Sequence, residues 1–126
     1  MGTDRRGVLE IIDYDMLELT GLKITIEQIV ERIRGITNAA IPALGCWVQI
    51  DKKLEAKVEE AKGWLSCPWP HPARCAKRVT YVKNLELGQS IKWADLNIHL
   101  IEKHNFLEGR GSPFRIEPKE LVKIIF

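Results

Sequence analysis

The residue types with the greatest chemical capacity lie in the second half of this sequence. Within the segment SCPWPHPARC, Cys67, His71 and Cys75 follow one another at intervals of four residues, and two more histidines follow at His99 and His104. Thiolates and imidazoles are the ligands that zinc prefers in proteins. These five residues therefore form the predicted metal site, with zinc as the ion that their chemistry favours.

Three prolines in that segment decide whether it can hold a metal. They forbid a regular helix and favour extended backbone. At about 3.1 Å per residue, an extended chain would hold Cys67 and His71 roughly 12 Å apart, too far for one zinc ion. A turn after His71 or a cis bond before the second proline would bring the ligands together. The alternatives are a stiff proline-rich structural loop and a Cys67–Cys75 disulfide.

The histidines predict a second part of the site. His99 and His104 are five residues apart, which is about 140° around an ideal helix, so both would bind one ion only if the last helical turn were distorted. The alternative is a half-buried histidine with a backbone partner.

A glycine-containing loop, EGRGSPFR, is the second candidate site. Gly109 and Gly111 allow the backbone to turn its amides toward a common point, as in anion-binding nests. Arg110, Ser112 and Arg115 would add donors to a phosphate or carboxylate. The loop lacks the Gly-Lys-Ser/Thr ending of a P-loop, so an ordinary turn is the alternative.

The same residues are also consistent with an enzyme. A small hydrolase-type enzyme would use His99 and His104, with Glu102 as general base and the loop 109–115 receiving an anionic group. No G-x-S-x-G, H-E-x-x-H or C-x-x-C motif is present to support it.

Hydrophobic periodicity and turn residues predict the elements that would position these groups. Thr25 and Gln28 form a capping box for a helix that Gly35 would end. The predicted elements are a strand at 7–17, the helix at 25–35, a buried strand at 45–50 with Cys46 in the core, a helix at 51–65, an antiparallel hairpin at about 78–93, a helix at about 94–104 and a short helix from Pro118. The sequence therefore predicts an α+β fold, a small mixed domain with two amphipathic helices in its N-terminal half.

Composition limits the class of protein. The chain has 126 residues, 45% hydrophobic and 29% charged, which predicts a single globular domain over 1–126. Its net charge of +2 does not indicate nucleic-acid binding. No apolar run approaches the length needed to cross a membrane, and no signal peptide is recognisable. An odd number of cysteines, three, favours a cytoplasmic location.

These features predict a small binding or regulatory module with a structural zinc site in its C-terminal half. Its ligand or protein partner is unknown from sequence. Besides the hydrolase, the alternative is an oligomeric structural protein, a homo-oligomer whose contact surface is the loop 66–75.

Overall fold

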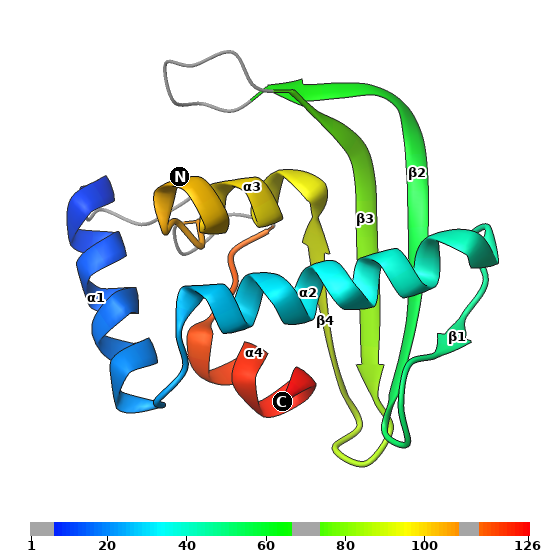
Figure 1. The fold of residues 1–126 in the computed structure, drawn as a ribbon, viewed down its shortest axis with the longest axis horizontal. Coiled ribbons are helices and arrows are strands. Elements are labelled where there is room, and N and C mark those ends of the chain that lie inside the picture. The colour runs from blue at the N-terminus through cyan, green and yellow to red at the C-terminus, as the bar shows by residue number, and fades with distance from the viewer. Residues whose placement is uncertain (1–6, 67–73, 109–113) are drawn as a thin grey trace.

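The protein has an α+β fold in which helices cover one face of a four-stranded antiparallel sheet (Figure 1). The computed structural model describes residues 7–66, 74–108 and 114–126. Along these residues the elements are α1 (Val8–Gly21), α2 (Ile26–Ala40), the 3-10 turn η1 (Ile41–Ala43), β1 (Val48–Gln49), β2 (Leu54–Ser66), β3 (Arg74–Asn84), β4 (Gln89–Ala94), α3 (Asp95–His104) and α4 (Pro118–Ile125). The predicted fold class is confirmed.

The sheet is a meander in which the strands lie in sequence order. The predicted hairpin is confirmed: β3 and β4 pair from Asn84–Gln89 at the turn to Val79–Ala94 at the far end. Asn84 closes this turn, because its side-chain oxygen accepts hydrogen bonds from the backbone of Glu86 and Leu87. The predicted helices after the hairpin and from Pro118 are confirmed as α3 and α4.

Alternation along β2 and β3 defines two faces of the sheet. On β2, Leu54, Ala56 and Val58 are buried, whereas the residues between them reach solvent. Successive side chains of a strand point to opposite faces, so these three residues mark the covered side, here called the inner face. Helix α2 crosses β2 and β3 on this side (Figure 1). The opposite side is called the outer face.

The helix predicted at 51–65 is wrong: this segment is the long strand β2. Leu54 and Val58 fit a helical stripe, but they also fit a period of two when Ala56 is included. The strand prevails because Ala56 is fully buried and lies between Val48 of β1 and Val82 of β3. Packing between neighbouring strands overrides the helix propensity of the Lys, Glu and Ala residues.

The strand predicted at 7–17 is also wrong, because these residues belong to α1. Ile11, Asp15 and Leu19 recur every four residues and are the buried side of this helix. The apolar residues Leu9 and Leu17 instead face solvent, and they made the sequence pattern ambiguous.

Two further boundaries differ from prediction. The Thr25–Gln28 capping box is confirmed. However, α2 continues past Gly35 to Ala40, because its residues Ile36 and Thr37 are buried in the core. Cys46 is exposed rather than in the core, and the strand beside it is only Val48–Gln49.

Buried hydrogen bonds fix α2 against the inner face. The indole Nε1 of Trp93 donates to Thr37 Oγ1 at 2.8 Å, and the same oxygen lies 2.9 Å from Thr80 Oγ1. All three side chains are buried, so one helix and two strands are joined inside the core.

A buried ion pair joins α1 to the segment before α4. Arg115 donates to both carboxylate oxygens of Asp15, with Nη2 to Oδ1 at 2.8 Å, and also to the carbonyl oxygen of Glu108. The side chains are 6% and 0% exposed. Burial alone would lower the pKa of Arg115, but Asp15 and Glu117 together raise it above its ordinary value.

Replacing Arg115 by Met is expected to lower the free energy of unfolding by about 3–5 kcal/mol, because Asp15 would remain buried without its cation. Arg34→Met is the matched control, since it removes an ion pair with Glu102 near the surface; its expected cost is about 1 kcal/mol or less. Urea denaturation measures both. Equal losses in the two variants would contradict the role of the buried pair.

Candidate functional site

The predicted metal ligands divide between described and undescribed parts of the chain. Cys67 and His71 lie outside the described residues. Cys75 stands near the start of β3, and His99 and His104 lie on α3. Cys75 and His99 border one cavity, and the His104 ring packs edge-on against His99 with 5.5 Å between ring centroids. The fold thus brings these three residues to one region of the molecule.

This arrangement does not by itself complete a metal site. Among residues 7–66, 74–108 and 114–126, no group of three His, Cys, Asp or Glu side chains is placed to hold one ion. Along β3, Cys75 alternates with Ala76 and therefore shares the face of Lys77 rather than that of Arg78. The zinc site stays a prediction.

The cavity between α2, α3 and β3, here called the inner pocket, has a volume of about 370 Å³. Its charges are paired: Arg78 Nη2 lies 2.7 Å from Asp95 Oδ2, and Arg34 Nη1 lies 2.8 Å from Glu102 Oε2. Its polar lining is therefore nearly neutral. The lining residues are Arg34, Thr37, Asn38, Cys75, Ala76, Arg78, Asp95, Ile98, His99 and Glu102.

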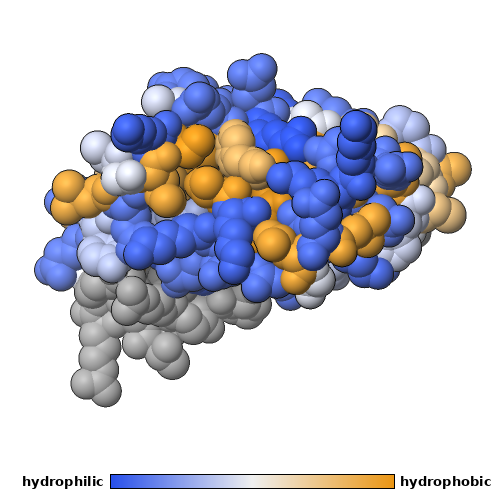
Figure 2. Space-filling model, turned by 90° about the horizontal axis from the view of Figure 1, so that it is seen from below, coloured by the Kyte–Doolittle hydropathy of each residue, from blue (hydrophilic) through white to orange (hydrophobic). Residues whose placement is uncertain are grey.

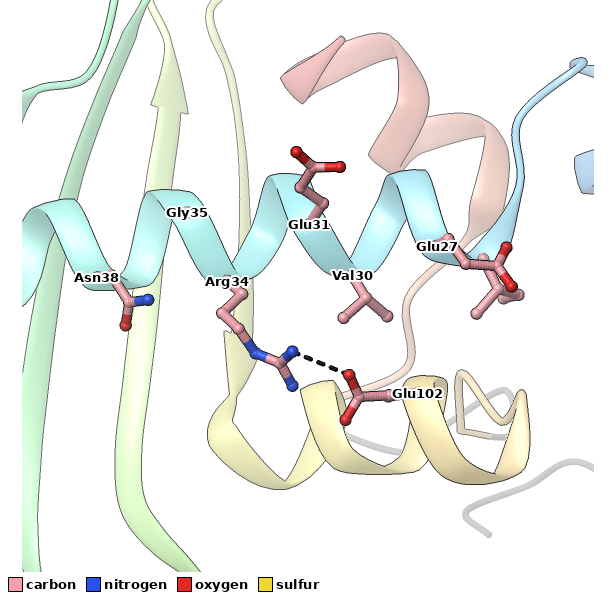
Figure 3. A pocket seen from close by; sticks show the side chains of 8 residues that line it. Glu27, Val30, Glu31, Arg34, Gly35, Asn38 and Glu102 are labelled. Atoms are coloured by element: carbon pink, nitrogen blue, oxygen red, sulfur yellow. Dashed lines mark hydrogen bonds and ion pairs between the residues drawn. The ribbon is translucent and has the colours of Figure 1, made fainter.

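A second hollow along α2 adjoins the inner pocket. Arg34, Asn38 and Glu102 border both, and the Arg34–Glu102 pair spans the space between α2 and α3 (Figure 3). The hydrogen bond from Arg34 lowers the pKa of Glu102 below its ordinary value. A general base works best with a pKa near the operating pH, so this environment does not favour the base role predicted for Glu102.

The predicted anion site also divides. Gly109, Arg110, Gly111 and Ser112 lie outside the described residues. Arg115 is described, and its guanidinium is occupied by the carboxylates of Asp15 and Glu117. In this position Arg115 stabilises the fold, and the rest of the anion site stays a prediction.

The outer face of the sheet carries a group of residues that the sequence did not reveal. Lys57 of β2, Tyr81 of β3 and Lys92 of β4 are directly opposite one another across three strands. Trp47, just before β1, extends this line at one end, and Phe114 extends it at the other. These five residues are called the aromatic–lysine row.

Cations and rings alternate along this row. The Lys57 ammonium lies 5.1 Å from the centroid of the Trp47 ring and 5.3 Å from that of Tyr81. The Lys92 ammonium lies 5.0 Å from the Phe114 centroid, and that of Lys83 lies 4.1 Å from Trp47. These distances are within the range of cation–π attraction. The rings are thereby held on a solvent-reaching surface.

One sequence signal could have indicated this face. Glu55, Lys57 and Glu59 alternate with Leu54, Ala56 and Val58. That alternation is typical of a strand with one wet side. The neighbours across the sheet are set by strand register, which the sequence alone does not give.

Exposed apolar residues elsewhere form no large continuous surface in the view from below. The β3–β4 turn exposes Leu85 and Leu87, and the C-terminal residue Phe126 is 40% exposed. On the face seen in Figure 2, hydrophobic residues are interrupted by hydrophilic ones. Among the described helices, none has the length and apolar character needed to span a membrane.

Comparisons with family models, with curated proteins and with solved structures find no match to this chain.

The Arg34–Glu102 pair predicts a pH effect. Folding lowers the pKa of Glu102 below its ordinary value of 4.5. The ionised carboxylate therefore stabilises the folded protein at pH values above 4.5, and this stabilisation is lost as the pH falls through the pKa of Glu102 in the folded state. Wild type is expected to exceed Glu102→Gln in stability at pH 7 by about 0.2–1 kcal/mol, and the difference should vanish in acid. Urea unfolding across that pH range measures it. A difference that persists at the acid end would contradict the ionic origin.

The zinc prediction has a direct test in cobalt binding. Co²⁺ bound by a thiolate gives a ligand-to-metal charge-transfer band, which wild type should show and Cys75→Ser should show at clearly lower intensity, because only Cys67 would remain as a thiolate ligand. Cys46→Ser is the matched control, because Cys46 is exposed and does not border the inner pocket. No band in wild type, or equal loss in both variants, would rule out Cys75 as a ligand.

Proposed function

We propose that this protein is a small binding module that takes single-stranded nucleic acid across the outer face of its sheet. The aromatic–lysine row is the observation that supports this function. Unpaired bases stack on aromatic rings, and lysines placed between the rings meet the phosphates that join successive bases.

Charge on the outer face complements such a ligand. The described residues of β2, β3 and β4 place four lysines on this face against two glutamates: Lys57, Lys77, Lys83, Lys92, Glu55 and Glu59. The face therefore has an excess of two positive charges, which equals the net charge of the whole chain, so acidic and basic residues balance elsewhere. Local excess of positive charge attracts a polyanion.

The rings favour a single strand over a duplex. Trp47 is 38% exposed, and Tyr81 is partly exposed. In a duplex the flat sides of the bases are already stacked on one another, so only a single strand offers them to these rings.

The predictions for other parts of the chain do not conflict with this proposal. A structural zinc ion and a cytoplasmic location are compatible with a nucleic-acid-binding module. The hydrolase and the oligomer with its contact surface at 66–75 stay predictions, and the described residues provide no observation that favours either.

Affinity for an oligothymidylate and an oligouridylate of about 12 nucleotides tests the function, because sheet-type single-strand sites span about that length. Fluorescence anisotropy gives the Kd. Tyr81→Leu is expected to weaken binding about tenfold through lost stacking, whereas Tyr81→Phe should bind like wild type. The tighter of the two wild-type complexes identifies the strand type.

A charge-matched pair of variants tests the phosphate contacts. Lys83→Ala/Lys92→Ala should weaken binding and reduce the slope of log Kd against log salt by roughly 1.4, the value for two phosphate contacts to a single strand. Lys119→Ala/Lys123→Ala removes the same charge from α4 and should leave the slope unchanged.

Three results would contradict the proposal. They are equal affinity for a duplex of the same length, equal effects of the two lysine pairs, and binding of an acidic peptide such as polyaspartate in place of either oligonucleotide. The last result would assign the face to an acidic protein partner.

A further inference from the structure

Beside the aromatic–lysine row, the outer face is hollowed. Glu59, Val79 and Ala94 are opposite one another across β2, β3 and β4, one step along from Lys57, Tyr81 and Lys92. A cavity of about 330 Å³ lies over this second line, here called the Phe114 pocket. Its lining residues are Glu59, Glu60, Ala61, Lys77, Arg78, Val79, Ala94 and Phe114.

The pocket has the size and walls that suit one planar ring system. Its volume is at the lower end of the range for small-molecule sites. Val79 and Ala94 offer an apolar surface, and Phe114 adds an aromatic ring. The Lys92 ammonium, 5.0 Å from the Phe114 centroid, links this ring to the aromatic–lysine row. A strand that stacks along the row would therefore pass the opening of the pocket.

Hydrogen-bond acceptors border the same pocket. Glu59 and Glu60 are exposed carboxylates, which can only accept hydrogen bonds when ionised. Lys57 holds Glu59 at 3.1 Å, and Arg78 Nη1 lies 3.9 Å from Glu60 Oε1. Each of the two carboxylates therefore has a cation nearby and lies beside an apolar surface.

We infer that the Phe114 pocket receives one nucleobase of the bound strand and selects bases that carry an exocyclic amine. Adenine, cytosine and guanine donate through that amine, and a carboxylate accepts from it. Thymine and uracil carry a carbonyl oxygen in place of that amine. Their one donor on this edge, N3–H, lies between two carbonyl oxygens, which repel a carboxylate that approaches it. Lys77, at the same pocket, is placed to meet the phosphate beside the selected base. This inference rests on the proposed function.

The test compares oligothymidylate with strands in which one central thymine is replaced by cytosine, adenine or guanine. Wild type is expected to bind at least one substituted strand about tenfold more tightly, the effect of one well-formed base contact. Val79→Phe fills the pocket from the sheet surface, and Glu59→Gln replaces an acceptor-only group by an amide. Val79→Phe should bind oligothymidylate like wild type and lose the preference. Glu59→Gln also removes a negative charge from the outer face and frees Lys57, so it should bind all four strands more tightly and lose the preference.

Tyr81→Leu is the matched control, because it lies on the aromatic–lysine row and not in the pocket. It should weaken binding of every strand and keep the preference. Thermal unfolding confirms that each variant is folded.

The possible outcomes distinguish base selection by the Phe114 pocket from nucleic-acid binding by the outer face. Binding of oligothymidylate without preference among the four strands would overturn the base pocket and leave the proposed function in place. A preference that survives Val79→Phe would also overturn it. Failure of every strand to bind would overturn both.

Discussion

Buried hydrogen bonds through Thr37 determine how α2 lies on the sheet. Its hydroxyl meets the Trp93 indole and the Thr80 hydroxyl inside a core that is otherwise mostly aliphatic. Apolar contacts alone tolerate small rotations of a helix, but a buried polar atom that loses its partner costs about 1–3 kcal/mol. The rotation of α2 is therefore set by three polar atoms. Ile33 and Ile36 consequently face the sheet, and Arg34 faces α3.

Among the described elements, α2, α3 and α4 all pack on the inner face, and none of these helices covers the outer face. The inner pocket has its arginines already paired with Asp95 and Glu102, so its charges stabilise the fold. In the aromatic–lysine row, Lys57 has a carboxylate partner in Glu59, but cation–π attraction is the contact that the row's lysines share, and it leaves the lysines and rings in reach of solvent. The geometry therefore favours function on a surface rather than in a cavity.

Local signals in the sequence predicted local structure well. The Thr25 capping box, the hairpin and α3 each depend on residues close together in the chain, and all three are confirmed. The segment at 51–65 fits two periodicities, and only its neighbours on both sides in the sheet favour the strand. The aromatic–lysine row runs from Trp47 to Phe114, and strand register places its three central residues, Lys57, Tyr81 and Lys92, side by side. The sequence grouped Cys75 and His99 in one predicted site, but it did not indicate which residues share a face of the sheet.

The Asp15–Arg115 pair also bears on how the protein is made. Its members are 100 residues apart, and both are nearly inaccessible in the folded state. A ribosome adds roughly 5–20 residues per second, so Arg115 follows Asp15 by about 5–20 s. During that interval α1 has its carboxylate but not its cation, and burying an unpaired charge is unfavourable. We therefore expect α1 to dock after the sheet and α2 have formed, although it is synthesised before them.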